Sequence, residues 1–231
     1  MNDERTSGLI IRLRPLTETS LIICWLTPNF GRISTVAKGA RRSKSPFRGK
    51  LDLFYYADFS FLKSRRSDLH TLREINLRET NPALRQDISY LQQTAYCSAL
   101  IEQTTETDTP LPNIFQLVID FLKNLPLHKP QPLNVFAFEM KLLHELGLKP
   151  DFTKNKLSAG TRQILENCVN QEWPALLRLK LSKNQITEIG QFLHGFLIYH
   201  LEKIPKGRSS AIRFRKAFWL SSIGSNQKAP G

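Results

Sequence analysis

The densest chemical signal in this sequence is a run of positive charge between residues 32 and 50. These nineteen residues hold no acid and seven cations, namely Arg32, Lys38, Arg41, Arg42, Lys44, Arg48 and Lys50. Lysine offers a point charge and arginine a planar fork of donors, and both suit the oxygens of a phosphate group. We therefore interpret the run as a contact surface for a polyanion backbone. A solvated basic patch without a partner is the alternative.

Two glycines and one aromatic residue lie inside this run. Gly39 and Gly49 can take positive φ or let the backbone approach a phosphate closely. Phe47 sits among the cations, where an aromatic ring can stack on a base. We therefore predict that Phe47 stacks on nucleic acid. Arg12 and Arg14, on the cationic face of a predicted strand, extend the candidate surface, whereas Arg65 and Arg66 fit a solvent-exposed turn equally well.

A second stretch without acids runs from residue 203 to residue 216 and holds six cations. The candidates for a second basic surface are Lys206, Arg208, Arg213, Arg215 and Lys216. An apolar triplet at residues 218–220 follows. This stretch is consistent with a second nucleic-acid surface and equally with a helix end that has a solvated face.

The composition of the whole chain agrees with an anionic partner. There are 33 Lys and Arg against 20 Asp and Glu, which gives a formal net charge of +13. Such a balance attracts DNA, RNA or an anionic membrane alike. The start of the chain lacks the pattern of a secretory signal, and no apolar run approaches the roughly 20 residues of a membrane span. The three cysteines form no CxxC pair, which is typical of a reducing cytoplasm.

Catalytic signatures are absent from the sequence. It contains no Walker loop, no HExxH and no GxSxG. Asp52 and Asp58 lie six residues apart on a predicted strand, a separation of about 20 Å. A two-metal site needs roughly 4 Å. We predict a protein that is not an enzyme.

The first 80 residues carry the signals of five strands. The expected strands cover residues 9–14, 20–26, 33–37, 51–61 and 70–78. In the fourth, apolar residues recur at every second position from Leu51 to Phe61, and we expect Tyr55, Phe59 and Phe61 in the core. Five short strands within about 80 residues predict a small closed barrel of the OB type. The basic run is then a loop held at both ends by the barrel.

The period changes to a helical one after residue 81. The expected helices cover residues 83–105, 112–122, 135–146 and 186–201. We therefore predict an α+β protein with an OB-fold domain at 1–80 and an all-α helical domain at 81–231.

Several short motifs resemble the RecO family of bacterial DNA repair proteins. The motifs are Leu26-Thr27, Gly31-Arg32-Ile33, Ala37-Lys38-Gly39-Ala40-Arg41-Arg42, Ser45, Arg48-Gly49-Lys50-Leu51 and Leu142-Leu143-His144-Glu145-Leu146-Gly147-Leu148-Lys149-Pro150. The resemblance implies an OB-fold barrel followed by a helical domain. It also implies recombination mediation. Such a protein binds single- and double-stranded DNA, anneals complementary strands, and acts with single-strand-binding protein and RecR to help load recombinase. The implied location is the bacterial cytoplasm, in association with the nucleoid.

The sequence departs from the family at its zinc motif. Many members follow the Gly-x-x-Pro helix end with a cysteine pair and later a second pair, which together hold zinc. Residues 151–156 contain no cysteine here, and Cys168 is the only cysteine downstream. One thiolate cannot make a tetrahedral structural site. We predict no zinc and no other cofactor, and expect packing through Phe152, Leu165 and Trp173 to hold this region.

The resemblance also suggests a mechanism. Annealing requires that two strands be held while their base-pairing edges stay free, and phosphate contacts allow this. The stretch from 203 to 216 could instead hold the acidic tail of single-strand-binding protein. Two other functions stay open on sequence alone: an RNA-directed OB-fold protein, and a scaffold whose basic face binds an acidic protein.

Overall fold

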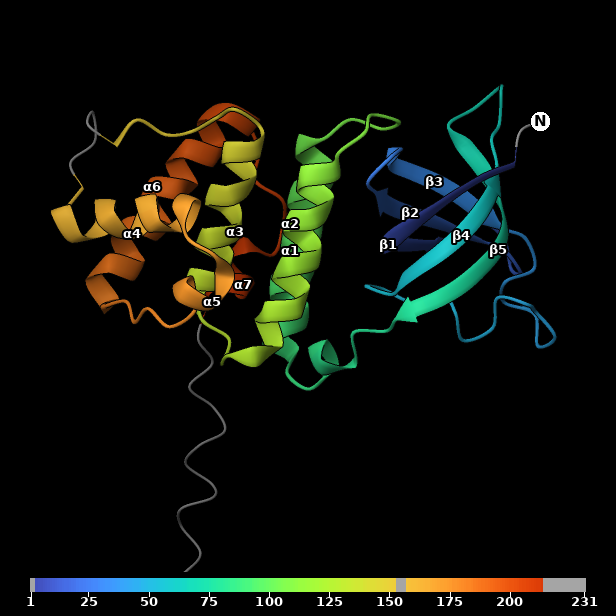
Figure 1. The fold of residues 1–231 in the computed structure, drawn as a ribbon, viewed down its shortest axis with the longest axis horizontal. Coiled ribbons are helices and arrows are strands. Elements are labelled where there is room, and N and C mark those ends of the chain that lie inside the picture. The colour runs from blue at the N-terminus through green and yellow to red at the C-terminus, as the bar shows by residue number, and fades with distance from the viewer. Residues whose placement is uncertain (1–2, 153–156, 214–231) are drawn as a thin grey trace, which may run out of the picture.

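The computed structural model describes residues 3–152 and 157–213. The first part of the chain forms a closed five-stranded barrel (Figure 1). Its strands are β1 (Asp3–Pro15), β2 (Leu21–Thr27), β3 (Gly31–Ala37), β4 (Tyr56–Leu62) and β5 (Leu69–Glu79). Their order around the barrel is β1-β2-β3-β5-β4, and only the β3–β5 pair is parallel. The predicted barrel is confirmed.

The interior of the barrel is aromatic and tightly packed. Trp25 stacks on Phe59, with ring centroids 4.0 Å apart. The indole Nε1 of Trp25 donates to Thr35 Oγ1 at 2.8 Å, so its one polar group is satisfied. Phe61 is also fully buried here. Phe59 and Phe61 thus occupy the core as predicted, whereas Tyr55 is only half-buried.

The faces of β1 differ from the expected alternation. Leu9, Ile10 and Ile11 are all buried, because Ile10 belongs to the barrel core while Leu9 and Ile11 pack against helices. A register shift between Ile10 and Arg12 accompanies this change. The expectation of one apolar and one cationic face was therefore wrong for the middle of the strand.

The fourth strand is shorter than predicted. β4 begins at Tyr56, and the chain turns at residues 51–55, where Tyr55 N–H donates to Asp52 O at 3.2 Å. Phe54 has a φ of 66° and is buried in the core that the barrel shares with the helices. Leu53 is 38% exposed. Because Phe54 turns toward the helices, the period-two pattern before Tyr56 does not mark a strand.

The second part of the chain is helical. Its elements are η1 (Pro82–Arg85), α1 (Ile88–Thr104), α2 (Pro112–Asn124), η2 (Leu125–Leu127), α3 (Pro132–Glu145), α4 (Ala159–Asn170), α5 (Trp173–Leu176), α6 (Lys183–Leu201) and α7 (Arg208–Ile212). Asp87 caps α1 by accepting from Ser89 N–H at 2.8 Å. Phe152, Leu165 and Trp173 are buried, as expected for a region held by packing. In the part of the chain that the structure describes, no helix combines the length and apolar character of a membrane span.

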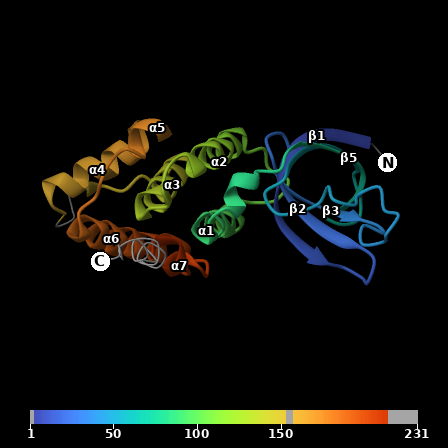
Figure 2. The ribbon, with the colours of Figure 1, turned by 90° about the horizontal axis from the view of Figure 1, so that it is seen from below.

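Helices α1 and α2 lie between the barrel and the remaining helices (Figures 1 and 2). The loop that joins them, residues 105–111, docks onto the start of β3. Asp108 N–H donates to Arg32 O at 3.0 Å, and Leu111 N–H donates to Pro28 O at 3.2 Å. Leu9, Leu26 and Phe54 of the barrel share one apolar core with the helices. The two parts therefore have a common core, and loop 105–111 is part of their boundary.

Candidate nucleic-acid interface

The basic loop between β3 and β4 is built from successive tight turns. Hydrogen bonds of the i to i+3 type link Gly39 to Arg42, Arg42 to Ser45, Ser45 to Arg48 and Phe47 to Lys50, at 3.0–3.2 Å. Gly39 and Gly49 have φ values of 68° and 73°, which confirms the prediction of positive φ at both glycines. The loop is also hydrogen-bonded to the segment between β1 and β2, because Arg41 N–H donates to Thr19 O at 2.9 Å. The loop is thus an ordered platform.

Phe47 does not have the role predicted for it. Its side chain is only 7% exposed and packs in the barrel core. A ring in this position cannot stack on a base, and the prediction was wrong. The large apolar ring is more stable inside the barrel than in water, so it draws the middle of the basic loop onto the barrel. Phe47 is the anchor of the platform.

The cations around this anchor point to solvent. Lys38, Arg41, Arg42, Lys44 and Arg48 are exposed, and Lys50 is half-buried. None of the six forms an ion pair with an acid in the described ranges. Arg48 Nη1 donates to Ser43 O at 3.2 Å, which fixes this side chain along the loop. Arg41, Arg42, Arg48 and Phe47 line a hollow of about 340 Å³. Backbone-anchored, unpaired cations can neutralise phosphates without large rearrangement.

Two other predicted contacts face the helices instead. Arg32 donates from Nε to Thr105 Oγ1 at 2.8 Å and from Nη2 to the Thr105 carbonyl. Burial lowers the pKa of the Arg32 guanidinium, while Glu102 acts in the opposite direction. Arg12 Nη1 lies 3.1 Å from Glu102 Oε2, although the Arg12 side chain is 61% exposed. The assignment of Arg32 to DNA was therefore wrong, because its donors hold loop 105–111. Arg14 stays exposed.

The β4–β5 hairpin presents a smaller basic surface. Lys63, Arg65 and Arg66 are exposed on it. At its base, His70 is buried and its ring stacks on Phe61, with centroids 5.2 Å apart.

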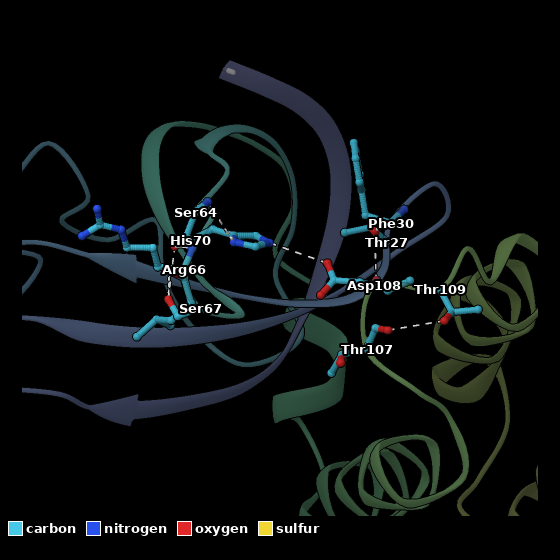
Figure 3. Close-up of polar contacts among 11 residues, drawn as sticks. Thr27, Phe30, Ser64, Arg66, Ser67, His70, Thr107, Asp108 and Thr109 are labelled. Carbon is cyan, nitrogen blue, oxygen red and sulfur yellow. Dashed lines mark hydrogen bonds and ion pairs between the residues drawn. The ribbon is translucent and has the colours of Figure 1, made fainter. Parts of the chain in front are cut away.

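His70 links this hairpin to the loop between α1 and α2 (Figure 3). Its Nδ1 accepts from Ser64 N–H at 3.4 Å, and its Nε2 lies 3.6 Å from Asp108 Oδ1. A neutral imidazole that accepts at Nδ1 carries its proton on Nε2, the atom that faces the carboxylate. Sequence reasoning missed this residue, because its partner lies 38 positions away and neither belongs to a motif.

The second basic stretch is only partly a surface. Lys206 and Arg213 are exposed, while Arg215 and Lys216 lie outside the described residues. Arg208 is 6% exposed and pairs with the buried Glu139, with Nε to Oε1 at 2.6 Å and Nη2 to Oε2 at 2.9 Å. The assignment of Arg208 to a DNA surface was wrong. A buried carboxylate needs a partner, and the bidentate guanidinium provides it while fixing α7 on α3.

The described residues contain no cluster of three or more His, Cys, Asp and Glu side chains that could hold a metal ion. Cys168 is buried, and burial raises the pKa of its thiol to about 12. A neutral thiol is a poor metal ligand. Residues 153–156 are not among those described, so the absence of zinc stays a prediction.

Comparison with known proteins gives the same family over both parts of the chain. The model of the recombination protein O N-terminal domain matches residues 1–81, and that of the C-terminal domain matches residues 85–156. A DNA repair protein RecO from Alkaliphilus metalliredigens is 34% identical over 152 residues, which are 64% of this chain and 60% of that protein. The protein of that name from Listeria monocytogenes serotype 4b is 32% identical over 158 residues, 68% and 61% of the two chains.

A third relative of the same name, from Bacillus subtilis strain 168, is 29% identical over 147 residues, 64% of this chain and 57% of that one. The matched region thus spans about 60% of the length of these relatives. The two domain models together cover the whole barrel, the basic loop and helices α1 to α3. With both domain models matched in order along one chain, the protein belongs to the RecO family.

Proposed function

We propose that this protein is a recombination mediator in DNA repair. It binds single- and double-stranded DNA through phosphate contacts and anneals complementary strands. It acts with single-strand-binding protein and RecR to help load recombinase, in the bacterial cytoplasm and in association with the nucleoid. The family membership and the relatives named DNA repair protein RecO support this role.

The observation that carries the proposal is the anchored basic loop. Its exposed cations have no acidic partner among the described residues, and Phe47 holds the loop on the barrel. Contacts to phosphates lower the repulsion between two strands and leave the base-pairing edges free. A loop of this kind holds a strand in a form that can still pair.

The action we propose is binding without catalysis. Asp52 and Asp58, the two barrel carboxylates considered as a metal pair, are each engaged elsewhere. Asp52 Oδ2 accepts from Arg85 Nη2 at 2.8 Å, and Asp58 Oδ2 accepts from Arg78 Nε at 2.6 Å. Both carboxylates therefore belong to surface ion pairs, Asp52 before β4 with Arg85 of η1 and Asp58 on β4 with Arg78 of β5. We also propose that the helical domain works without zinc.

An annealing assay tests the proposal. Complementary single strands are coated with single-strand-binding protein, and the wild-type protein is compared with Arg41→Glu/Arg42→Glu. The matched control is Lys123→Glu/Lys183→Glu, which makes the same charge change at two exposed positions on α2 and α6. We expect annealing by the wild type and the control, and loss in the loop variant. A loop variant that anneals like the control would overturn the proposal.

Matched DNA and RNA oligonucleotides separate this function from an RNA-directed one. We expect the wild-type protein to anneal DNA, and a strong preference for RNA would favour an RNA-directed function. Binding of an acidic protein that survives in the loop variant while annealing is lost would argue against a scaffold role.

A further inference from the structure

The basic loop borders two hollows, and Phe47 lines both. The smaller is the cationic hollow inside the loop. The larger, of about 700 Å³, extends from Phe47 and Lys50 along strands β1, β4 and β5. We call this larger hollow the barrel groove. Because Phe47 borders both, the two hollows lie next to each other at the same segment of the basic loop.

The register of three strands fixes the wall of the barrel groove. Arg5 of β1 pairs with Ser60 of β4, and Ser60 pairs with Glu74 of β5. Arg73 lies beside this row, at the register shift between β4 and β5. All four residues line the groove. The strands are hydrogen-bonded neighbours in a closed barrel (Figure 1), so the positions of these side chains are set by the sheet.

The charges of the barrel groove favour an anion. Arg5, Lys50 and Arg73 line it, and none of them has an ion-pair partner in the described parts of the chain. Of the two acids present, Asp58 is neutralised by Arg78. Glu74 is exposed and subtracts one charge. Three cations against one free carboxylate leave a net positive hollow.

The rest of the lining suits a nucleotide. Phe47, Phe59 and Ile75 are buried in the barrel core and reach the groove only with the edges of their side chains, which supply apolar surface, and Thr6 and Asn76 supply groups that form hydrogen bonds. Ser60 Oγ is buried beside them and has no hydrogen-bond partner within the described structure. Apolar walls with a few polar groups and a volume of this size are typical of sites for small organic groups.

We propose that the barrel groove takes the single-stranded continuation of DNA held by the basic loop, with Arg5 and Arg73 on its phosphates. This inference rests on the proposed function and adds a discrimination between strand types. Single nucleotides can enter a hollow of this size, whereas the stacked pairs of a duplex contact only its rim. Single-strand sites on one OB barrel extend over roughly 4–16 nucleotides, which is compatible with contacts both in the loop and along the strands.

The test compares Arg5→Glu/Arg73→Glu with the wild type on two probes. The probes are an oligothymidine of about 16 nucleotides and a duplex of the same length, the upper end of single-barrel sites. Loss of two phosphate contacts should make the salt slope for the single strand less negative by about 1.4 and weaken its binding roughly tenfold at about 0.1 M salt. We expect the duplex affinity to change no more than it does in Lys123→Glu/Lys183→Glu.

A second variant acts in the opposite direction. Glu74→Gln removes the one free carboxylate of the barrel groove at an exposed position, so we expect it to strengthen single-strand binding. Equal losses on both probes in Arg5→Glu/Arg73→Glu, or losses no larger than those of the control, would overturn the inference. So would unchanged or weaker single-strand binding in Glu74→Gln.

The loop variant Arg41→Glu/Arg42→Glu, measured in parallel, separates the two proposals. If that variant loses both probes while Arg5→Glu/Arg73→Glu matches the control, only the barrel groove assignment fails. If the loop variant keeps both probes, the proposed function itself fails.

Discussion

His70 of β5 and Asp108 of the α1–α2 loop face each other across the boundary between the barrel and the helices, with Nε2 3.6 Å from Oδ1. The same loop receives the guanidinium of Arg32 at Thr105. The basic surface is thus carried by a barrel whose orientation on the helices is fixed by polar contacts as well as by apolar packing. The donors of Arg32 are used in these contacts with Thr105 and are therefore not free to bind a phosphate.

Gly31 should be the glycine at this boundary that tolerates substitution least. Its φ is +60°, and a Cβ added there would lie 1.7 Å from Thr109 O. We expect Gly31→Ala to lower the free energy of unfolding by at least 1–3 kcal/mol, roughly the cost of the backbone conformation alone. Thermal unfolding measures it. Gly195→Ala is the control, because open space surrounds Gly195 on α6 and alanine favours a helix by about 1 kcal/mol. Equal stability of both variants would contradict the docking of loop 105–111.

The buried pair of Glu139 and Arg208 should be strongly coupled. Tyr96 Oη also donates to Glu139 Oε1, at 2.6 Å. Arg208→Met leaves the carboxylate buried without its cation, and we expect a loss of about 3–5 kcal/mol in urea unfolding. The double variant Glu139→Gln/Arg208→Met removes both charges and should recover part of this loss. A double variant less stable than either single one would show that the two residues do not act as a pair.

The sequence predicts the barrel well where strand patterns are local. Residues 33–37 and the aromatic positions Phe59 and Phe61 fall in β3 and in the barrel core as expected. The pattern fails at Leu53 and Phe54, because alternation cannot tell a strand from a turn whose aromatic side chain is buried by helices. That burial depends on residues far along the chain.

The candidate site divides in the same way. The exposed cations of the loop, such as Arg41 and Arg42, can be recognised in the sequence, because they lie in a run of Lys and Arg that contains no Asp or Glu. The partners of Arg32 and Arg208 lie 73 and 69 positions away, so composition could not remove these two arginines from the surface. The barrel groove could not be predicted from the sequence either, because Arg5 and Arg73 line one hollow only through the pairing of β1 and β5 with β4.

The buried cysteines predict a dependence of stability on pH. Burial raises the pKa of Cys168 to about 12, and it also raises the pKa of Cys97. In the unfolded chain these thiols lose their protons near pH 8.5, roughly their ordinary value. Above this pH the folded state binds more protons than the unfolded state. The contribution of these thiols to the free energy of unfolding should therefore be fully present below about pH 8.5 and be lost as the pH rises toward 12. Urea unfolding at a series of pH values measures this loss.

Thiol labelling checks the same property by another route. The thiolate is the reactive form, so in the native protein near pH 8 we expect an alkylating reagent to modify only the half-buried Cys24. All three cysteines should react in urea. Labelling of Cys168 at the same rate in both states would contradict its buried position.

The salt dependence of binding should report the number of loop cations in contact with DNA. If four to six of them engage phosphates, the slope of log K against log salt for a single strand should be about −3 to −4. Fluorescence anisotropy with a labelled oligothymidine measures the slope. A slope near zero would mean that the loop does not bind through its charges.

Phe47 offers the sharpest distinction between an anchor and a stacking residue. Phe47→Ala opens a cavity in the barrel core, and we expect it to cost about 3–5 kcal/mol and to weaken DNA binding because the loop is released. Phe47→Leu keeps most of the apolar volume without an aromatic ring. An anchor tolerates leucine, so this variant should retain both stability and affinity, measured by urea unfolding and anisotropy. Stable folding with lost affinity in Phe47→Leu would instead show that the ring itself contacts bases and that the buried position changes when DNA binds.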